Sequence, residues 1–423
     1  MMTGKRPVLH YTPPVGWLNA PASLTVHDGQ YHLFHRAVLE ATTWGPSGSW
    51  GHAVSSDLVT WTARPAALTP GRGDSGCWAG CLCVPPQGPA TLFYTAVAPT
   101  DRGLARIRVA RALDDSWDTW RKGAVVVLPP WGDRREEELR MFRDPCVVRE
   151  PGGWRMLVGA GYVDGRAGVV SFTSPDLVDW SYTGCFLDRS VASTDPVWAG
   201  SGWECPQLLS VEGRDVLVLS AWHDGVTRHV VAAIGTRVRD RFVVGHWTRI
   251  GYGPGPYAPT AFTDADGEPG LVFWLRDVTD TAAGWAGALS VPYRLSLAGD
   301  GGLRITPHPA VLGAGPTALA AGGGEVLGLT WGSAGGPPSG GLDLRTDSGH
   351  RVIALRIYGD VLEVVGTQTT IPLAGESVQV LVDRGIVEIC TGRALLALAA
   401  EYPAVALAAP VGEGITVWWP THG

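Results

Sequence analysis

The chain has 423 residues, of which 45% are apolar and 17% are charged, and its formal net charge is -7. This composition is typical of a globular protein, and the length favours two domains over one. The negative net charge argues against binding to nucleic acid or to an anionic membrane surface.

The N-terminal residues are followed by no apolar run of signal-peptide length, and no later stretch approaches ~18 uninterrupted apolar residues. We therefore expect a cytoplasmic protein that acts on a small soluble molecule. The chain has seven cysteines, and an odd number favours buried free thiols over a disulfide framework. Because no metal-ligand spacing and no nucleotide or phosphate motif occurs, we expect no metal and no cofactor.

The first part of the chain, from about residue 8 to 295, consists of short apolar segments that alternate with polar residues and are separated by Gly, Pro, Asp and Ser. Examples lie at residues 30–35, 90–94 and 216–220. A period of two between turn signals predicts antiparallel strands, and no long stretch has the 3.6-residue period of a helix. The predicted fold class is all-β.

An internal repeat indicates how these strands are arranged. The segment at 55–61, Ser-Ser-Asp-Leu-Val-Thr-Trp, recurs at 173–180 and more loosely at 112–120. A unit of roughly 60 residues predicts a five-bladed β-propeller over residues 1–295. We expect the aspartate of each segment to form a turn, and the tryptophan that ends it to pack between blades.

The second predicted domain, residues 296–423, begins with a Gly/Ala/Pro-rich connection that contains a strand-like stretch at 326–331. Clean alternation follows at 351–357, 378–384 and 387–390. Short strands with tight turns predict a C-terminal β-sandwich. Three of its charged residues, Asp383, Arg384 and Glu388, are expected to have a structural role.

Three short motifs follow one another in an order that resembles a known enzyme family. They are Trp-Leu-Asn-Ala-Pro-Ala-Ser at residues 17–23, Arg-Asp-Pro at 143–145 and Trp-Glu-Cys-Pro at 203–206. Together they resemble glycoside hydrolase family 32, which includes invertases, inulinases and levanases. The string at 382–389 also resembles the sandwich that these proteins attach to their propeller.

The resemblance implies a role for each motif. Glu204 matches the family's acid/base, and Asp144 matches the carboxylate that steadies the transition state, with Arg143 beside it. A retaining glycosidase also needs a nucleophilic carboxylate, but the residue at the position of the family's nucleophile is Ala20. Because a methyl group cannot attack an anomeric carbon, the resemblance does not imply standard retaining fructosidase chemistry here.

Other departures fall on positions that contact the sugar in the family. The Asn-Gly pair after the proline is Ala22-Ser23, a glutamine is Arg36, and a Phe-Ser pair is Trp78-Ala79. An extra cation and a larger aromatic ring favour a substrate more anionic or aromatic than sucrose. The residues expected to bind the substrate are Trp17, Asn19, Arg36, Trp50, Trp78, Ala79 and Tyr257.

Three functional hypotheses remain open. The first is a divergent enzyme in which Glu204 and Asp144 perform acid/base chemistry on a small glycoside or other metabolite, by hydrolysis or by cyclisation, elimination or rearrangement. The second is a sugar-binding pseudoenzyme. The third is a β-fructofuranosidase inactivated by an engineered replacement of its aspartate by Ala20. We favour the first, because one designed substitution would not change the other pocket positions as well.

Overall fold

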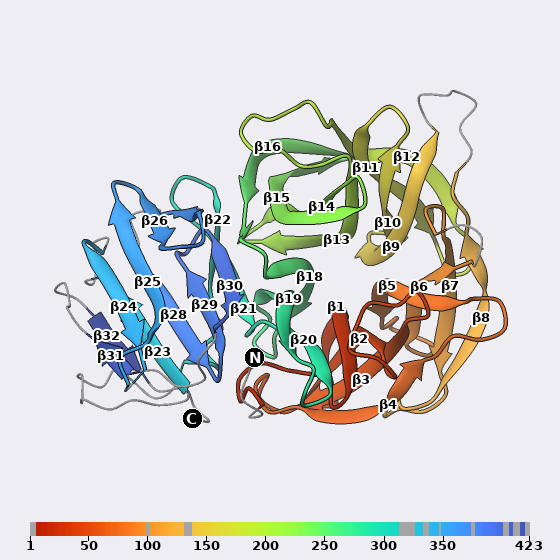
Figure 1. Ribbon diagram of the computed structural model, residues 1–423. Coiled ribbons are helices and arrows are strands. Elements are labelled where there is room, and N and C mark those ends of the chain that lie inside the picture. The colour runs from red at the N-terminus through yellow and green to blue at the C-terminus, as the bar shows by residue number, and fades with distance from the viewer. Residues whose placement is uncertain are drawn as a thin grey trace.

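The computed structural model describes residues 6–98, 102–130, 138–312, 326–332, 338–346, 348–373 and 377–400, together with the backbone of two strands at 406–408 and 415–418. Its regular elements are all strands, which confirms the predicted all-β class. A large ring of sheets and a smaller pair of sheets lie side by side (Figure 1). In the described part of the chain, no helix has the length and apolar character needed to cross a membrane.

The ring is the predicted five-bladed propeller. Four blades each contain four antiparallel strands that follow one another in the chain, and the first of these blades is joined to the fifth in a nine-stranded sheet. Their strands are β1 (Gly16–His27), β2 (Gln30–Val38), β3 (Ser49–Ser55) and β4 (Thr62–Leu68); β5 (Gly76–Cys83), β6 (Thr91–Val97), β7 (Arg106–Ala112) and β8 (Trp120–Val127); β9 (Leu139–Glu150), β10 (Gly153–Tyr162), β11 (Arg166–Ser174) and β12 (Ser181–Ser190); and β13 (Gly202–Val211), β14 (Arg214–His223), β15 (Val226–Val238) and β16 (Arg241–Arg249).

The fifth blade closes the ring. It contains β18 (Pro256–Thr263), β19 (Pro269–Asp280), β21 (Tyr293–Leu297) and β22 (Leu303–Pro307). A further strand, β20 (Trp285–Leu289), pairs with β19 on one side and, in parallel, with β1 on the other. The last strand of this sheet, β22, ends at Pro307.

The repeated aspartates form turns, as predicted. Asp57 Oδ1 accepts hydrogen bonds from backbone N–H groups two and three residues on, at 2.9 and 2.7 Å, and Asp176 does the same at 2.9 and 3.0 Å. The repeated tryptophans pack between blades. Trp120 meets Phe34 of the first blade edge to face, and Trp180 meets Phe93 of the second blade in the same way.

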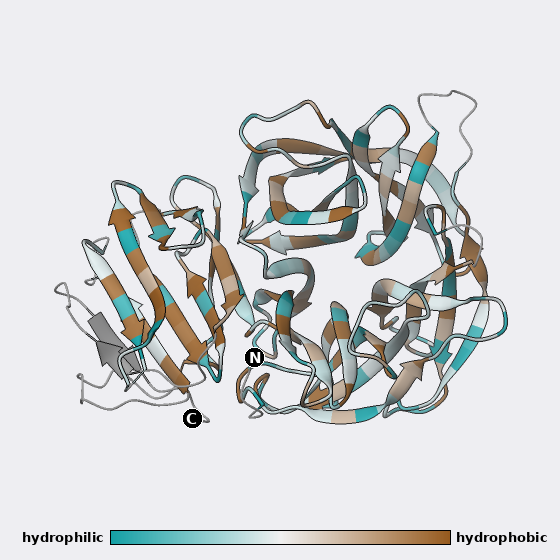
Figure 2. Ribbon diagram, viewed as in Figure 1, coloured by the Kyte–Doolittle hydropathy of each residue, from teal (hydrophilic) through white to brown (hydrophobic). Residues whose placement is uncertain are grey.

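The smaller domain is the predicted sandwich of two sheets. One sheet has the order β17 (Gly251–Tyr252), β30 (Leu395–Ala399), β29 (Ile386–Cys390), β28 (Val378–Asp383), β23 (Val326–Trp331) and β32 (Ile415–Trp418). The other has the order β27 (Thr369–Pro372), β26 (Val361–Val364), β25 (Arg351–Tyr358), β24 (Gly341–Arg345) and β31 (Ala406–Ala408). Apolar bands alternate with polar ones along these strands (Figure 2), and buried Leu, Ile and Val side chains fill the space between the sheets. Strand β23 confirms the stretch predicted at 326–331, whereas most of the Gly/Ala/Pro-rich connection lies outside the described residues.

A buried polar network joins the two domains. The carboxylate of Asp383, at the end of β28, accepts hydrogen bonds from the backbone N–H groups of residues 8, 9 and 10 at 2.8 to 3.1 Å. It also lies 2.8 Å from His10 Nδ1, and Glu388 lies 3.3 Å from His10 Nε2. Tyr293 of the fifth blade donates a hydrogen bond of 2.6 Å to Glu388. Asp383 and Glu388 therefore have the structural role that we expected.

Candidate functional site

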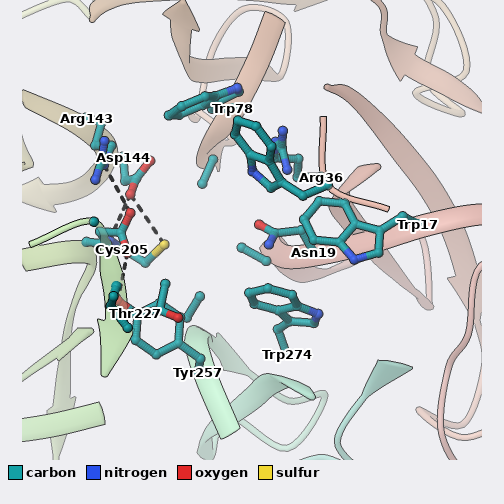
Figure 3. A pocket seen from close by; sticks show the side chains of 17 residues that line it. Trp17, Asn19, Arg36, Trp78, Arg143, Asp144, Cys205, Thr227, Tyr257 and Trp274 are labelled. Carbon is teal, nitrogen blue, oxygen red and sulfur yellow. Dashed lines mark hydrogen bonds and ion pairs between the residues drawn. The ribbon is translucent and has the colours of Figure 1, made fainter. Parts of the chain in front are cut away.

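A pocket of about 550 Å³ lies among the inner strands of the propeller, β1, β5, β9, β13 and β18 (Figure 3). Acidic, basic and aromatic side chains share its walls. The lining residues are Trp17, Asn19, Ala20, Arg36, Trp44, Trp78, Ala79, Arg143, Asp144, Glu204, Cys205, Gly225, Val226, Thr227, Tyr257, Ala258 and Trp274.

Each of the five inner strands is irregular at the level of the pocket. In every case one or two residues drop out of the regular pairing with the next strand, as in a β-bulge. These are residues 19–20 of β1, 78–79 of β5, 144 of β9, 205–206 of β13 and 258–259 of β18. Because a bulge redirects side chains, it explains why adjacent residues such as Trp78 and Ala79 both line the pocket. Asp144, Cys205 and Ala258 have φ values of 64°, 47° and 41°, the left-handed region that such residues seldom adopt.

Glu204 on β13 is held by two neighbours. Arg143 Nε lies 3.1 Å from Glu204 Oε1. The hydroxyl of Tyr257 lies 2.7 Å from Glu204 Oε2 and 3.0 Å from the carbonyl oxygen of Ala221. The phenol has one proton, so it can donate to an ionised Glu204, or donate to Ala221 while accepting the proton of a neutral Glu204. Both protonation states of the carboxyl group are therefore accommodated.

Asp144 is buried beside Glu204. Its backbone N–H donates to Thr95 Oγ1 at 2.7 Å, and its Oδ2 accepts a hydrogen bond of 3.2 Å from the backbone N–H of Cys205. Burial, and then the negative charge of Glu204, raise the pKa of Asp144 to about 6, although Arg143 opposes the shift. Burial also raises the pKa of the Cys205 thiol, so that thiol is neutral.

On the other side of the pocket, Arg36 of β2 lies between the rings of Trp17 and Trp78, with its guanidinium carbon 5.2 and 5.5 Å from their centroids (Figure 3). The side chain also donates a hydrogen bond to the carbonyl oxygen of Gly45. Because only 3% of the residue is exposed, burial lowers the pKa of Arg36 to about 10. It remains a cation at neutral pH.

The structure brings ten of the eleven predicted site residues to the pocket, including Ala20, whose methyl group stands in the β1 bulge. The exception is Trp50. It is fully buried behind Trp78 and donates a hydrogen bond of 2.8 Å to the carbonyl oxygen of Trp78. Trp50 therefore does not line this pocket, and its indole instead fixes the backbone of the strand that carries Trp78.

Sequence reasoning missed two tryptophans of the pocket. Trp44 belongs to the loop between β2 and β3, is 52% exposed, and has its ring centroid 6.4 Å from that of Trp78. Trp274 of β19 meets Trp17 edge to face at 5.5 Å. The hairpin between β14 and β15 also contributes residues 225–227. No motif contains these residues; the abundance of tryptophan was the one available signal for Trp44 and Trp274.

Adjacent carboxyl groups in the central pocket of the propeller are the groups that glycoside hydrolases use, and the class of protein is shown by its family. Residues 10–308 match the N-terminal domain of glycosyl hydrolases family 32, and the chain belongs to that family. It is 31% identical over 331 residues to a sucrose-6-phosphate hydrolase of Zymomonas mobilis, which covers 71% of this chain and 61% of that protein. It is 30% identical over 312 residues to a sucrose-6-phosphate hydrolase of Escherichia coli, and this match covers 69% of this chain and 62% of that protein. The chain thus spans less than two thirds of the length of these relatives.

Solved structures show the same fold. A GH32 β-fructofuranosidase of Bombyx mori superposes with a TM-score of 0.82 at 21% identity, covering 99% of this chain and 95% of that one. A variant of that enzyme is described in complex with sucrose. A sucrose-6-phosphate hydrolase of Lactobacillus gasseri superposes with a TM-score of 0.79 at 22% identity, covering 99% and 94%.

Proposed function

We propose that this protein acts on a small glycoside through acid/base chemistry of Glu204, assisted by Asp144, and without a covalent intermediate on residue 20. The observation that carries the proposal is the combination, in one pocket, of two interacting carboxyl groups with the methyl group of Ala20. The hydrogen-bonding position of Tyr257 supports proton transfer by Glu204. We also propose a cytoplasmic location, which cell fractionation tests.

The substrate we propose is a fructoside or a related glycoside that has an anionic or aromatic part. The relatives named above are sucrose-6-phosphate hydrolases and a β-fructofuranosidase, which supports a fructosyl group. Arg36 supports an anionic part, because it brings a buried cation to the wall of the pocket. Trp44 and Trp78 support an aromatic or sugar ring, because both present apolar surface on which such a ring can stack.

Activity assays distinguish this function from two others, a sugar-binding pseudoenzyme and a disabled fructosidase. A pseudoenzyme binds the same ligands and turns none of them over at any pH. A disabled fructosidase regains strong activity when the aspartate is restored.

A paired assay of this chain and Ala20→Asp tests the proposal. The substrates are sucrose, sucrose 6-phosphate, 1-kestose and a nitrophenyl fructoside, and the readouts are substrate consumption and released fructose. We expect the unmodified chain to consume at least one of them, and Ala20→Asp not to raise fructose release to the level of an invertase, because Arg36 lies opposite the new carboxylate in the strand register and would pair with it. A gain in fructose release of several powers of ten in Ala20→Asp would contradict the proposal and favour a disabled fructosidase.

The pH dependence of turnover provides a second test. Burial, and then the negative charge of Glu204, raise the pKa of Asp144 to about 6, so Asp144 loses its proton as the pH rises through that value. The acid chemistry of Glu204 is assisted by the protonated Asp144, so we expect kcat/KM to fall roughly tenfold per unit as the pH rises above about 6. Asp144→Asn removes the neighbouring charge, and its profile should lose the inflection near pH 6. A profile that is flat from pH 5 to 8 in the unmodified chain would contradict the role given to this pair.

A further inference from the structure

Arg36 is a buried cation that forms no direct ion pair with any carboxylate of the described chain. Among the described residues, no carboxylate lies within ion-pair distance of its guanidinium, in contrast to Arg143, which pairs with Glu204. Its guanidinium contacts two tryptophan rings and one carbonyl oxygen, that of Gly45, and the carboxylates of Asp144 and Glu204 act on its charge only from a longer distance. Burying a charge costs free energy unless a counterion or several hydrogen bonds compensate for it. Arg36 therefore favours the entry of an anion into the pocket.

The strand register places this cation beside the position that lacks a nucleophile. Leu18 pairs with Ala37 and Pro21 pairs with His35, so Arg36 is the one residue of β2 opposite the bulge formed by residues 19–20. Both Arg36 and Ala20 line the pocket. An anion held by Arg36 would thus lie next to the methyl group of Ala20, in the space that a longer side chain at that position would occupy.

The negative groups of the pocket lie on the opposite wall. Figure 3 shows Arg36, Asn19 and Trp17 on one side, and Asp144 with Arg143 on the other. An anion beside Arg36 is therefore kept apart from the carboxylate of Asp144, which would repel it at short distance. Arg36 presents planar donors, a shape that suits a phosphate or a carboxylate.

We propose that a small oxyanion, of which inorganic phosphate is the simplest, binds between Arg36 and Ala20 and attacks the anomeric carbon in place of the missing carboxylate. The proposal rests on the proposed function, because it requires Glu204 to act as the acid. It adds an acceptor to that function: the reaction becomes transfer of a glycosyl group to phosphate rather than to water.

The reaction balances without any further reagent. Glu204 gives its proton to the glycosidic oxygen as the bond from that oxygen to the anomeric carbon breaks. An oxygen of hydrogen phosphate forms the new bond to the same carbon, and the proton that the phosphate carried passes to Glu204. The overall change converts a glycoside and hydrogen phosphate into a glycosyl phosphate and a free alcohol, with no change of oxidation state.

The binding step is tested by titration calorimetry of the full chain with inorganic phosphate. We expect saturable binding that weakens at least about tenfold in Arg36→Gln, which removes the charge, and less in Arg36→Lys, which keeps it. Ala20→Asp should weaken phosphate binding as well, because its carboxylate would occupy the same place. It serves as a second variant if Arg36→Gln proves unstable. Arg237→Gln is the matched control, because Arg237 lies near the exposed C-terminal end of β15 and pairs there with Asp215 and Glu150. No saturable binding, or equal loss in the control, overturns the proposal.

The chemical step is tested by phosphorus NMR on mixtures of the protein, phosphate and each of the four glycosides used above. We expect a new phosphate ester resonance with at least one donor, absent in Arg36→Gln and in Glu204→Gln. If fructose is released equally fast with and without phosphate and no ester forms, the oxyanion role is overturned while the proposed acid chemistry of Glu204 stands. If no glycoside is consumed under any condition, both proposals are overturned.

The same experiment identifies the source of the anion. Sucrose with inorganic phosphate and sucrose 6-phosphate without it are run in parallel. If sucrose 6-phosphate binds in a manner that depends on Arg36 and inorganic phosphate neither binds nor competes, Arg36 recognises the phosphate group of the substrate. That outcome overturns the proposal that an external anion is the nucleophile.

Discussion

Replacing Glu204 with glutamine is expected to lower kcat by about 10²–10⁴-fold on any glycoside that the unmodified chain consumes. The amide has the shape of the carboxyl group and can keep its contact with Tyr257, but it cannot give a proton to a leaving oxygen. The loss should be much smaller for a nitrophenyl fructoside than for sucrose, because nitrophenolate leaves without being protonated. Steady-state kinetics on the two substrates measure this difference.

A matched control lies on the same hairpin. Glu212 is exposed at the turn between β13 and β14, at the far end of β13 from the pocket, and Glu212→Gln should leave the kinetics unchanged. If Glu204→Gln retains full turnover of sucrose-like substrates, Glu204 is not the acid. If the unmodified chain binds glycosides without turnover and Glu204→Gln binds them equally well, the pseudoenzyme hypothesis is the correct one.

The second large effect concerns stability. Asp383→Asn is expected to lower the free energy of unfolding by about 3–5 kcal/mol, because it removes one partner of a buried ion pair and leaves backbone N–H groups facing an amide. His10 contributes to the effect. Although burial alone would lower the pKa of His10, its contacts with Asp383 and Glu388 raise that pKa to about 9. Urea unfolding followed by tryptophan fluorescence measures the change.

The sign of the pH dependence follows from the raised pKa of His10. Its contribution to stability is complete below the ordinary histidine pKa of about 6.5 and is lost as the pH rises through about 9. The unmodified chain should therefore become less stable between these values, and Asp383→Asn should lose most of this dependence. Asp300→Asn is the control: its ion pair with Arg393 also joins the two domains, but the Asp300 side chain is 68% exposed. That variant should change stability by less than about 1 kcal/mol. If both variants lost the same free energy of unfolding, burial would not be the reason why the Asp383 network stabilises the protein.

The fold could be predicted from the sequence because its signals are local. Period-two alternation identified strands such as β25 and β28, and the repeated turn around Asp57 and Asp176 indicated the blade length. The pairing of β21 and β22 was harder to predict. Strands β21 and β22 alternate as strands of a sandwich do, and only their pairing with β19 shows that they belong to the propeller.

The motifs located residues that do line the pocket, such as Asp144 and Glu204, whereas their chemical roles stay predictions. Trp50 was misplaced because a sequence does not reveal which face of a strand points to the pocket once bulges shift the alternation. Trp274 was missed because it lies in an apolar run that resembles a strand of the hydrophobic core. The absence of a direct ion pair for Arg36 among the described residues could not be predicted either, because it depends on distances between segments far apart in the chain.

The bulges on the five inner strands have a consequence for how this protein can change. Residues in a bulge lie outside the regular ladder, so exchanging their side chains need not break the hydrogen bonds that hold a blade together. On each inner strand, the residues that pair with the neighbouring strand are thus different from the bulge residues that line the pocket. A library restricted to positions 19, 20, 78 and 79, which line the pocket within the bulges of β1 and β5, would therefore sample new reactivity while the strand ladders stay intact.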